Sequence, residues 1–128
     1  MKHKIMIVDD EDYIRFLYAE ELRDEGYEVV TASSGFRIVE KIEKEKPDLV
    51  VLDIKIKEHN GLDILQTIKN RFEDLPVGIC SAYDTFKDDI KSLAADFYVV
   101  RSFDLDQLKN SIAASLEEYR QKIKKRPV

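Results

Sequence analysis

One aspartate stands where an open α/β sheet would place a reactive group. The apolar run over residues 49–52 ends abruptly on Asp53. The run follows Pro47 and is too short for a helix, so it is typical of a strand buried on both faces of a parallel sheet. Ligands bind outside the carboxyl ends of the strands in such sheets. Asp53 is therefore a candidate nucleophile or metal ligand.

Other polar side chains directly follow apolar runs elsewhere in the chain. They are Asp9 and Asp10 after residues 4–8, Ser81 after residues 76–80, and Arg101 after residues 97–100. The carboxyl ends of parallel strands meet at one edge, and the order 2-1-3-4-5 makes the two acidic strands neighbours. Clustered carboxylates raise one another's pKa, and Mg²⁺, which prefers carboxylate and phosphate oxygens, relieves that conflict.

These residue types suit phosphoryl transfer. A carboxylate nucleophile, here Asp53, can accept a phosphoryl group as an aspartyl phosphate. The charge on the phosphoryl oxygens must then be neutralised, by a metal on one side and a fixed cation on the other. We expect Asp10 and Asp53 to hold the metal, Arg101 to reach the phosphoryl group from the opposite side, and Ser81 to donate a hydrogen bond.

Each of these residues also has an ordinary structural interpretation. Asp9 or Asp10 could cap the first helix, and Asp53 could simply end its strand. The combination of these aspartates with Ser81 and Arg101 on one edge favours the functional interpretation.

The remaining pattern alternates between strands and helices. A further strand is predicted over residues 27–32, and the polar segment 55–61, which ends in Asn60-Gly61, is predicted to be a loop. Helices are predicted from apolar residues at helical spacing. These residues are Ile14, Leu17, Tyr18 and Leu22, closed by Gly26; Ile38, Val39 and Ile42; Leu62, Leu65, Ile68 and Phe72; Phe86, Ile90 and Leu93, capped by Asp84; and Leu105, Leu108, Ile112 and Leu116, capped by Asp104 with Gln107. Five strands alternating with five helices predict a parallel sheet covered on both faces.

Composition narrows the class of protein. The chain of 128 residues carries a net charge of −5, with 44% hydrophobic residues and one cysteine, Cys80. A single cysteine excludes an internal disulfide framework and a cysteine-based metal site. No stretch approaches 18 apolar residues, so we expect a cytoplasmic protein without membrane insertion. Residues 119–128 hold five basic residues and no acid, so the other 118 residues have a net charge of −10. This acidic body argues against nucleic-acid binding.

The chain resembles the receiver domains of two-component response regulators. The resemblance rests on Asp9-Asp10, Asp53, Ser81-Ala82-Tyr83 and a basic residue after residues 97–100. It covers about residues 3–118, and the set of motifs is specific although each motif alone is weak. We therefore expect a receiver domain over residues 1–118 and a basic helical extension or tail over 119–128.

The resemblance implies a flavodoxin-like (βα)5 three-layer sandwich whose five-stranded parallel sheet has the order 2-1-3-4-5. It also implies transfer of a phosphoryl group from a histidine kinase or phosphotransfer protein to Asp53 with Mg²⁺. In the family the metal is bound by the residues matching Asp10, Asp53 and the backbone carbonyl of Lys55, and Asp9 assists through water. The switch pair matches Ser81 and Tyr98, which reshape the face made by the fourth helix, fifth strand and fifth helix. A downstream protein would bind that face, and a phosphorylation-dependent homodimer is an open alternative. The domain would be a phosphoryl acceptor that at most catalyses its own phosphorylation and dephosphorylation.

Three positions depart from the family pattern. Arg101-Ser102 replaces a Lys-Pro pair whose peptide bond is cis, and Lys57 replaces a common proline. Arginine keeps the charge but presents a planar fork instead of a point ammonium. Without proline a cis bond before Ser102 would cost about 2.5–4 kcal/mol, so we expect a trans bond. Lys55 and Tyr83, which flank the site, could shield the phosphoryl group from water.

Two alternatives to a working receiver remain open at this level. The Arg101-Ser102 pair motivates a pseudo-receiver, an interaction module with impaired phosphorylation or switching. An unrelated Mg²⁺-dependent phosphatase using Asp53 is disfavoured, because such enzymes commonly need a second carboxylate at the position that Lys55 occupies. The apolar residues Tyr119 and Ile123 continue the stripe of the last helix, so this helix is expected to project as a dimerisation surface or as the start of a linker.

Overall fold

The chain folds around a five-stranded parallel sheet. A computed structural model describes residues 2–56, 59–82, 95–102 and 104–125. The strands are β1 (Lys4–Val8), β2 (Glu28–Ala32), β3 (Leu49–Leu52), β6 (Val77–Ser81) and β7 (Phe97–Val100). Their order is β2-β1-β3-β6-β7, and every pair is parallel. This is the predicted order 2-1-3-4-5, so the flavodoxin-like fold is confirmed.

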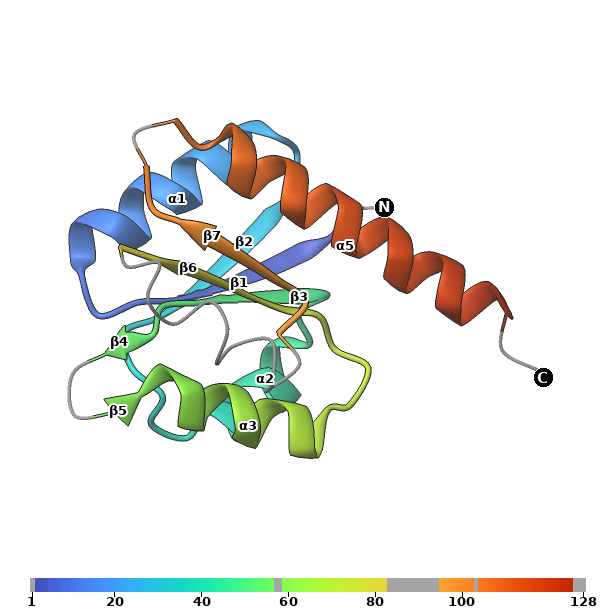
Figure 1. The fold of residues 1–128 in the computed structure, drawn as a ribbon, viewed down its shortest axis with the longest axis horizontal. Helices are drawn as coiled ribbons and strands as arrows, with labels where there is room; N and C mark the ends of the chain where they lie inside the picture. Colours follow the sequence, from blue (N-terminus) through green and yellow to red (C-terminus); the bar gives the residue numbers. More distant parts are fainter. Residues whose placement is uncertain (1, 57–58, 83–94, 103, 126–128) are drawn as a thin grey trace.

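Helices cover both faces of the sheet. The described helices are α1 (Asp12–Asp24), α2 (Ile38–Glu45), α3 (Gly61–Arg71) and α5 (Asp106–Lys125). Figure 1 shows α1 and α5 on one face and α2 with α3 on the other. The predicted fourth helix over residues 84–93, with its cap Asp84, lies outside the described residues.

Alternation along the strands explains the three layers. In β1, Ile5 and Ile7 pack with residues of α1 and α5, while Met6 and Val8 pack with residues of α2 and α3. Successive side chains of a strand point to opposite faces, so a strand between two helical layers must be apolar at every position. All four residues of β3 and all five of β6 are accordingly buried.

The ends of the helices agree with the local sequence. Gly26 follows α1 with φ +95°, a left-handed conformation that glycine adopts without steric cost, as the sequence predicted. Lys46 ends α2 with φ +51°, and Pro47 then prevents the helix from continuing. The Asn60 side chain accepts a hydrogen bond of 2.8 Å from Leu62 N and caps α3. Asp104 accepts one of 2.9 Å from Asp106 N at the start of α5.

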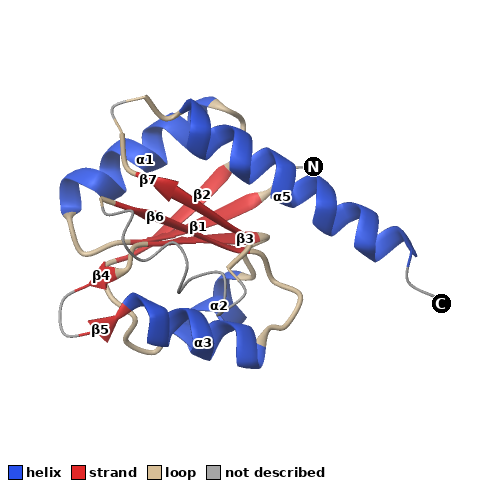
Figure 2. Cartoon of the chain, in the orientation of Figure 1, coloured by secondary structure: helices blue, strands red, loops and turns tan. Residues whose placement is uncertain are grey.

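One predicted loop is partly ordered as strands. The segment predicted as a polar loop over residues 55–61 contains β4 (Lys55–Ile56) and β5 (His59–Asn60), which pair in antiparallel fashion. These strands have two residues each and little alternation in polarity, so they give almost no sequence signal. Figure 2 shows this small hairpin beside the main sheet, next to the start of α3.

The last helix continues past the body of the domain. Leu116 is buried, but residues 120–124 of α5 are exposed and Ile123 keeps 43% of its surface accessible. The final turns of α5 extend beyond the sheet (Figure 1). Within the described part of the chain, no helix combines the length and apolar character needed to cross a membrane.

Candidate functional site

Three carboxylates converge at the carboxyl edge of the sheet. Asp9 and Asp10 follow β1 and Asp53 follows β3, and these neighbouring strands pair Val8 with Leu52 at their ends. The Asp53 amide donates a 3.1 Å hydrogen bond to the Val8 carbonyl, which ties the two strand ends together. One oxygen from each aspartate lies within 4.8 Å of the others. The predicted convergence of these side chains is therefore present in the structure.

The burial of this cluster has an electrostatic cost. Asp9 is 3% exposed and Asp53 is 6% exposed. Burial raises the pKa of Asp9, and the nearby charge of Asp53 raises it as well. A 2.9 Å hydrogen bond from Glu11 N and the charge of Arg101 oppose the increase, and the resulting pKa is about 6. The site thus holds a carboxyl group that resists ionisation in the absence of a bound cation.

Arg101 supplies a positive charge next to two of these aspartates. Its Nη2 atom lies 2.8 Å from Asp9 Oδ2 and 3.3 Å from Asp53 Oδ2, and its Nη1 atom lies 3.3 Å from Glu11 Oε1. The Arg101 amide donates a 2.6 Å hydrogen bond to the Ser81 carbonyl, so the backbone is fixed beside β6. Burial lowers the pKa of Arg101, but the charges of Asp9 and Asp53 together raise it above its ordinary value. The guanidinium is therefore a permanent cation.

The two predicted switch residues lie on neighbouring strands. Ser81 ends β6 and is fully buried, next to Val100 in β7. Tyr98 pairs with Ile79 and packs, half-buried, against the core on the side of α2 and α3. Their roles in switching stay predictions.

The other predicted site features are less fully described. Lys55 lies in β4, two residues beyond Asp53, and its role as a carbonyl ligand stays a prediction. Tyr83, the proposed shield, lies outside the described residues. The structure contains no cis peptide bond among the described residues, so the trans bond expected before Ser102 is confirmed.

Neither aspartate of the acidic pair occupies the N-cap position of the first helix. The N-cap residue of α1 is Glu11, and Asp9 instead accepts the hydrogen bond from the Glu11 amide. Glu11 also contacts Arg101, a role that the sequence reasoning missed. The only sequence signal for it is its place directly after the acidic pair. Glu11 therefore joins the cluster as a fourth carboxylate.

Gly61 supports the backbone that carries Asp53. Its amide donates a 2.6 Å hydrogen bond to the Ile54 carbonyl, and a Cβ atom here would lie 2.5 Å from Ile54 Cα and closer still to the Asp53 carbonyl oxygen. We expect Gly61→Ala to lower the free energy of unfolding by about 1–3 kcal/mol, because backbone atoms cannot rotate away as a side chain can. Urea unfolding followed by circular dichroism tests this effect.

A matched control for Gly61→Ala is available in the same protein. Gly26 has nothing within 4 Å of an added Cβ, although its φ of +95° imposes strain on any other residue. Gly26→Ala therefore separates conformational strain from steric overlap. A Gly61→Ala variant as stable as the parent would contradict the tight contact with residues 53–54.

The donor set of the cluster fits a divalent cation. Three aspartates offer carboxylate oxygens from two adjacent strand ends, which are the hard ligands that Mg²⁺ prefers. Two of them are nearly inaccessible to solvent, whereas Asp10 is partly exposed and leaves one side open. The site can therefore present a metal to a small anion arriving from solvent.

A hollow of about 620 Å³ adjoins the cluster. It is lined by Tyr13, Ile14, Leu17 and Tyr18 of α1 together with Ala82, Arg101 and Ser102. Tyr13 and Phe16 of α1 are 71% and 68% exposed. An apolar surface therefore borders the charged site.

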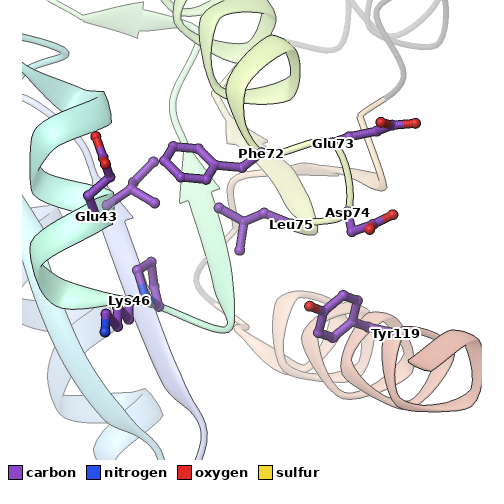
Figure 3. A pocket seen from close by; sticks show the side chains of 9 residues that line it. Glu43, Lys46, Phe72, Glu73, Asp74, Leu75 and Tyr119 are labelled. Atoms are coloured by element: carbon purple, nitrogen blue, oxygen red, sulfur yellow. The ribbon is translucent and has the colours of Figure 1, made fainter. Parts of the chain in front are cut away.

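A second hollow lies at the opposite edge of the sheet. Its volume is about 510 Å³. Figure 3 shows the side chains around it, which come from the ends of α2 and α3, from the segment before β6 and from α5, including Phe72, Leu75 and Tyr119. It lies at the amino ends of β3 and β6, away from the aspartate cluster. This hollow is therefore separate from the candidate site.

Comparison with known proteins gives a consistent family assignment. A family model described as the response regulator receiver domain matches residues 5–113. The chain is 36% identical over 114 residues to sporulation initiation phosphotransferase F of Bacillus subtilis, a match covering 88% of this chain and 92% of that protein. It is 33% identical to the alkaline phosphatase synthesis transcriptional regulatory protein PhoP of the same organism, covering 91% of this chain and 49% of that protein.

Solved structures of receiver domains are also similar to this chain. The response regulator TrrA of Thermotoga maritima, crystallised with Mg²⁺ and BeF, has a TM-score of 0.84 and 40% identity, covering 90% of this chain and 99% of that one. A CheY-like receiver domain from Methanospirillum hungatei has a TM-score of 0.88 and 25% identity, covering 95% and 99%. By sequence, fold and the arrangement of its aspartates, the chain belongs to the response regulator receiver domain family.

Proposed function

We propose that this domain accepts a phosphoryl group on Asp53, with Mg²⁺ held by Asp10, Asp53 and the Lys55 carbonyl, and by Asp9 through water. The observation that carries the proposal is the convergence of three aspartates within 4.8 Å, two of which also contact the guanidinium of Arg101. The similarity to TrrA, whose structure contains Mg²⁺ and BeF, supports the same ligand class here.

The residues of the site divide the chemistry among them. An Asp53 carboxylate oxygen attacks the phosphorus atom of the donor, the bond from phosphorus to the donor atom breaks, and an aspartyl phosphate remains. Bound Mg²⁺ would neutralise charge on the phosphoryl oxygens. Arg101 would supply a second positive charge and hydrogen bonds to the phosphoryl oxygens, and the Ser81 hydroxyl would donate to a further phosphoryl oxygen.

The donor would be a histidine kinase or a phosphotransfer protein. Such a donor must bring its phosphorylated side chain to Asp53, so its binding surface has to border the site. The exposed rings of Tyr13 and Phe16 and the hollow lined in part by Arg101 offer apolar contact area at the edge of the site. The relative named sporulation initiation phosphotransferase F is consistent with onward transfer of the phosphoryl group as one output.

The response to phosphorylation would run through Ser81 and Tyr98. Movement of the hydroxyl toward the phosphoryl group and rotation of the ring inward would shift the balance between two packings of the face that includes β7 and α5. A downstream protein, or a second copy of the chain in a phosphorylation-dependent dimer, would read this face. Residues 1–118 would form the receiver and 119–128 its basic extension.

The pseudo-receiver and phosphatase alternatives fit the site less well than a phosphoryl acceptor does. The pseudo-receiver alternative is motivated by the Arg101-Ser102 pair. Against it, the Arg101 guanidinium lies 3.3 Å from Asp53 Oδ2, within reach of a phosphoryl group on that residue. The phosphatase alternative still lacks a carboxylate two residues past Asp53, where Lys55 stands. A phosphoryl acceptor in a signalling pathway, not an enzyme acting on a separate substrate, therefore fits the site best.

The proposal is tested with a small phosphodonor. Incubation with acetyl phosphate and millimolar Mg²⁺ should add one phosphoryl group, and proteolytic mapping should place it on residue 53. Chelation of Mg²⁺ should prevent the modification. A chain that stays unmodified with Mg²⁺, and that gives no spectral response to beryllofluoride, would contradict the proposed function.

A further inference from the structure

The guanidinium of Arg101 contacts three carboxylates, and of these three only Glu11 lies outside the proposed metal site. Nη2 bridges Asp9 and Asp53, the two buried carboxylates, whereas Nη1 contacts Glu11. The Glu11 side chain is 58% exposed, against 4% for Asp9 and 7% for Asp53. Glu11 is therefore the solvent-side anchor of the guanidinium.

The position of Arg101 conflicts with a divalent cation in the same cluster. Mg²⁺ needs oxygen ligands at about 2.0–2.1 Å in near-octahedral geometry, and the carboxylate oxygens nearest to Nη2 belong to two of the aspartates that would surround the ion. Two cations a few ångströms apart also repel each other. The contacts of Nη2 with Asp9 and Asp53 must therefore weaken when a metal binds.

The contact with Glu11 does not carry this conflict. The Glu11 backbone is held by the hydrogen bond from its amide to Asp9 Oδ1 and by its N-cap position on α1, and its exposed carboxylate lies on the solvent side of the cluster. Arg101 Nε, moreover, is buried without a hydrogen-bond acceptor among the described residues. The present position thus leaves one donor unsatisfied, and an outward movement exposes it to water.

We propose that Glu11 is a positioning residue that holds the Arg101 guanidinium at the rim of the site when a divalent cation displaces it from Asp9 and Asp53. Glu11 thereby keeps the arginine within reach of the phosphoryl group that the metal-loaded site would receive. This inference rests on the proposed function, because it takes Asp9, Asp10 and Asp53 as the metal site. It applies to a chain that carries arginine at position 101, whose forked guanidinium can contact Glu11 and the aspartates together.

The proposal predicts a coupling between Glu11 and Arg101 in metal affinity. Mg²⁺ binding is measured by isothermal titration calorimetry on the parent chain and on Glu11→Gln, Arg101→Ala and the double variant. We expect Arg101→Ala to tighten Mg²⁺ binding about tenfold, because the competing cation is gone. We expect Glu11→Gln to weaken Mg²⁺ binding about threefold, because the displaced guanidinium loses its remaining carboxylate partner. The effect is modest because the Glu11–Arg101 ion pair is exposed.

The double variant distinguishes positioning from a simple charge effect. If Glu11 acts through Arg101, Glu11→Gln should change Mg²⁺ affinity in the Arg101→Ala background no more than Asp12→Asn does. Asp12 is the matched control, since it is the next residue, is 93% exposed and pairs with Arg15 instead of Arg101. An equal loss of affinity from Glu11→Gln in both backgrounds would overturn the proposal.

A spectroscopic measurement reports the movement itself. In ¹⁵N-labelled protein, Mg²⁺ should shift the side-chain Nε–H resonance of Arg101 in the parent chain, and this resonance should broaden further in Glu11→Gln. Arg101→Lys provides a second variant if Arg101→Ala does not fold, and it should tighten Mg²⁺ binding less than alanine does.

Unchanged affinity in Arg101→Ala, with Mg²⁺ still bound by the parent chain, would overturn the inference alone. Absence of Mg²⁺ binding in every variant would overturn the proposed function with it.

Discussion

Replacement of Asp53 by asparagine is expected to abolish phosphoryl acceptance. The amide has nearly the shape of the carboxylate but lacks the anionic oxygen that attacks phosphorus and forms an acyl phosphate. Because Asp53 is 6% exposed and its backbone is tied to Val8, the isosteric change should leave the fold intact. Intact-mass spectrometry after incubation with acetyl phosphate and Mg²⁺ should therefore show no added phosphoryl group.

A matched aspartate on the surface controls for this substitution. Asp63 lies exposed in the first turn of α3, and Asp63→Asn should be phosphorylated as fast as the parent chain. Asp10→Asn should retain the nucleophile but lose a metal ligand, so its phosphorylation should be much slower and should respond less to added Mg²⁺. Phosphorylation of Asp53→Asn at the parent rate would mean that another residue is the acceptor.

The convergence of the site residues was predictable because a parallel sheet leaves little freedom. Asp9 and Asp53 follow runs that are apolar at every position, and such runs are strands buried on both faces. Right-handed crossovers then bring all the carboxyl ends to one edge. The position of Arg101 follows from the same argument, since it directly follows β7 and its amide bonds the Ser81 carbonyl.

The features that could not be predicted from the sequence depend on the directions of side chains, on very short strands and on an unusual backbone conformation. Glu11 follows the acidic pair and resembles an ordinary first-turn residue, and only the reach of the Arg101 side chain shows that the two meet. The hairpin of β4 and β5 was missed because two-residue strands have no period. The left-handed conformation of Arg37, at φ +53°, has no residue-type signal, since glycine and asparagine usually fill such positions.

The site also shows why functional residues depart from the rules that govern the core. Replacing buried polar groups elsewhere in the sheet by apolar ones would be expected to stabilise the protein or leave its stability unchanged. At this edge, however, Asp9 and Asp53 lie buried close to each other, with their charges balanced in part by Arg101. This arrangement is unfavourable for the metal-free fold and favourable for binding a divalent cation, and the two effects can be separated by experiment.

The second large effect concerns Asp9 and pH. Its pKa in the folded chain is about 6, above its ordinary value of 3.8, because burial disfavours the carboxylate. Between these two values the folded state binds more protons at Asp9 than the unfolded state does. The contribution of Asp9 to the free energy of unfolding therefore falls as the pH rises from about 4 to about 6, by about 3 kcal/mol in total, and is constant above that window.

Asp9→Asn should consequently stabilise the metal-free protein at pH 8, by about 1–3 kcal/mol, and this advantage should shrink toward zero near pH 4. Urea unfolding in a chelator, followed by circular dichroism because the chain has no tryptophan, measures both values. Asp63→Asn, on the surface, should show no such pH-dependent difference. Lower stability of Asp9→Asn than of the parent chain at pH 8 would show that the ion pair with Arg101 outweighs the cost of burial. Added Mg²⁺ should reduce or reverse the stability advantage of Asp9→Asn over the parent chain at pH 8. Mg²⁺ binding stabilises the folded parent chain, and the variant has partly lost this binding.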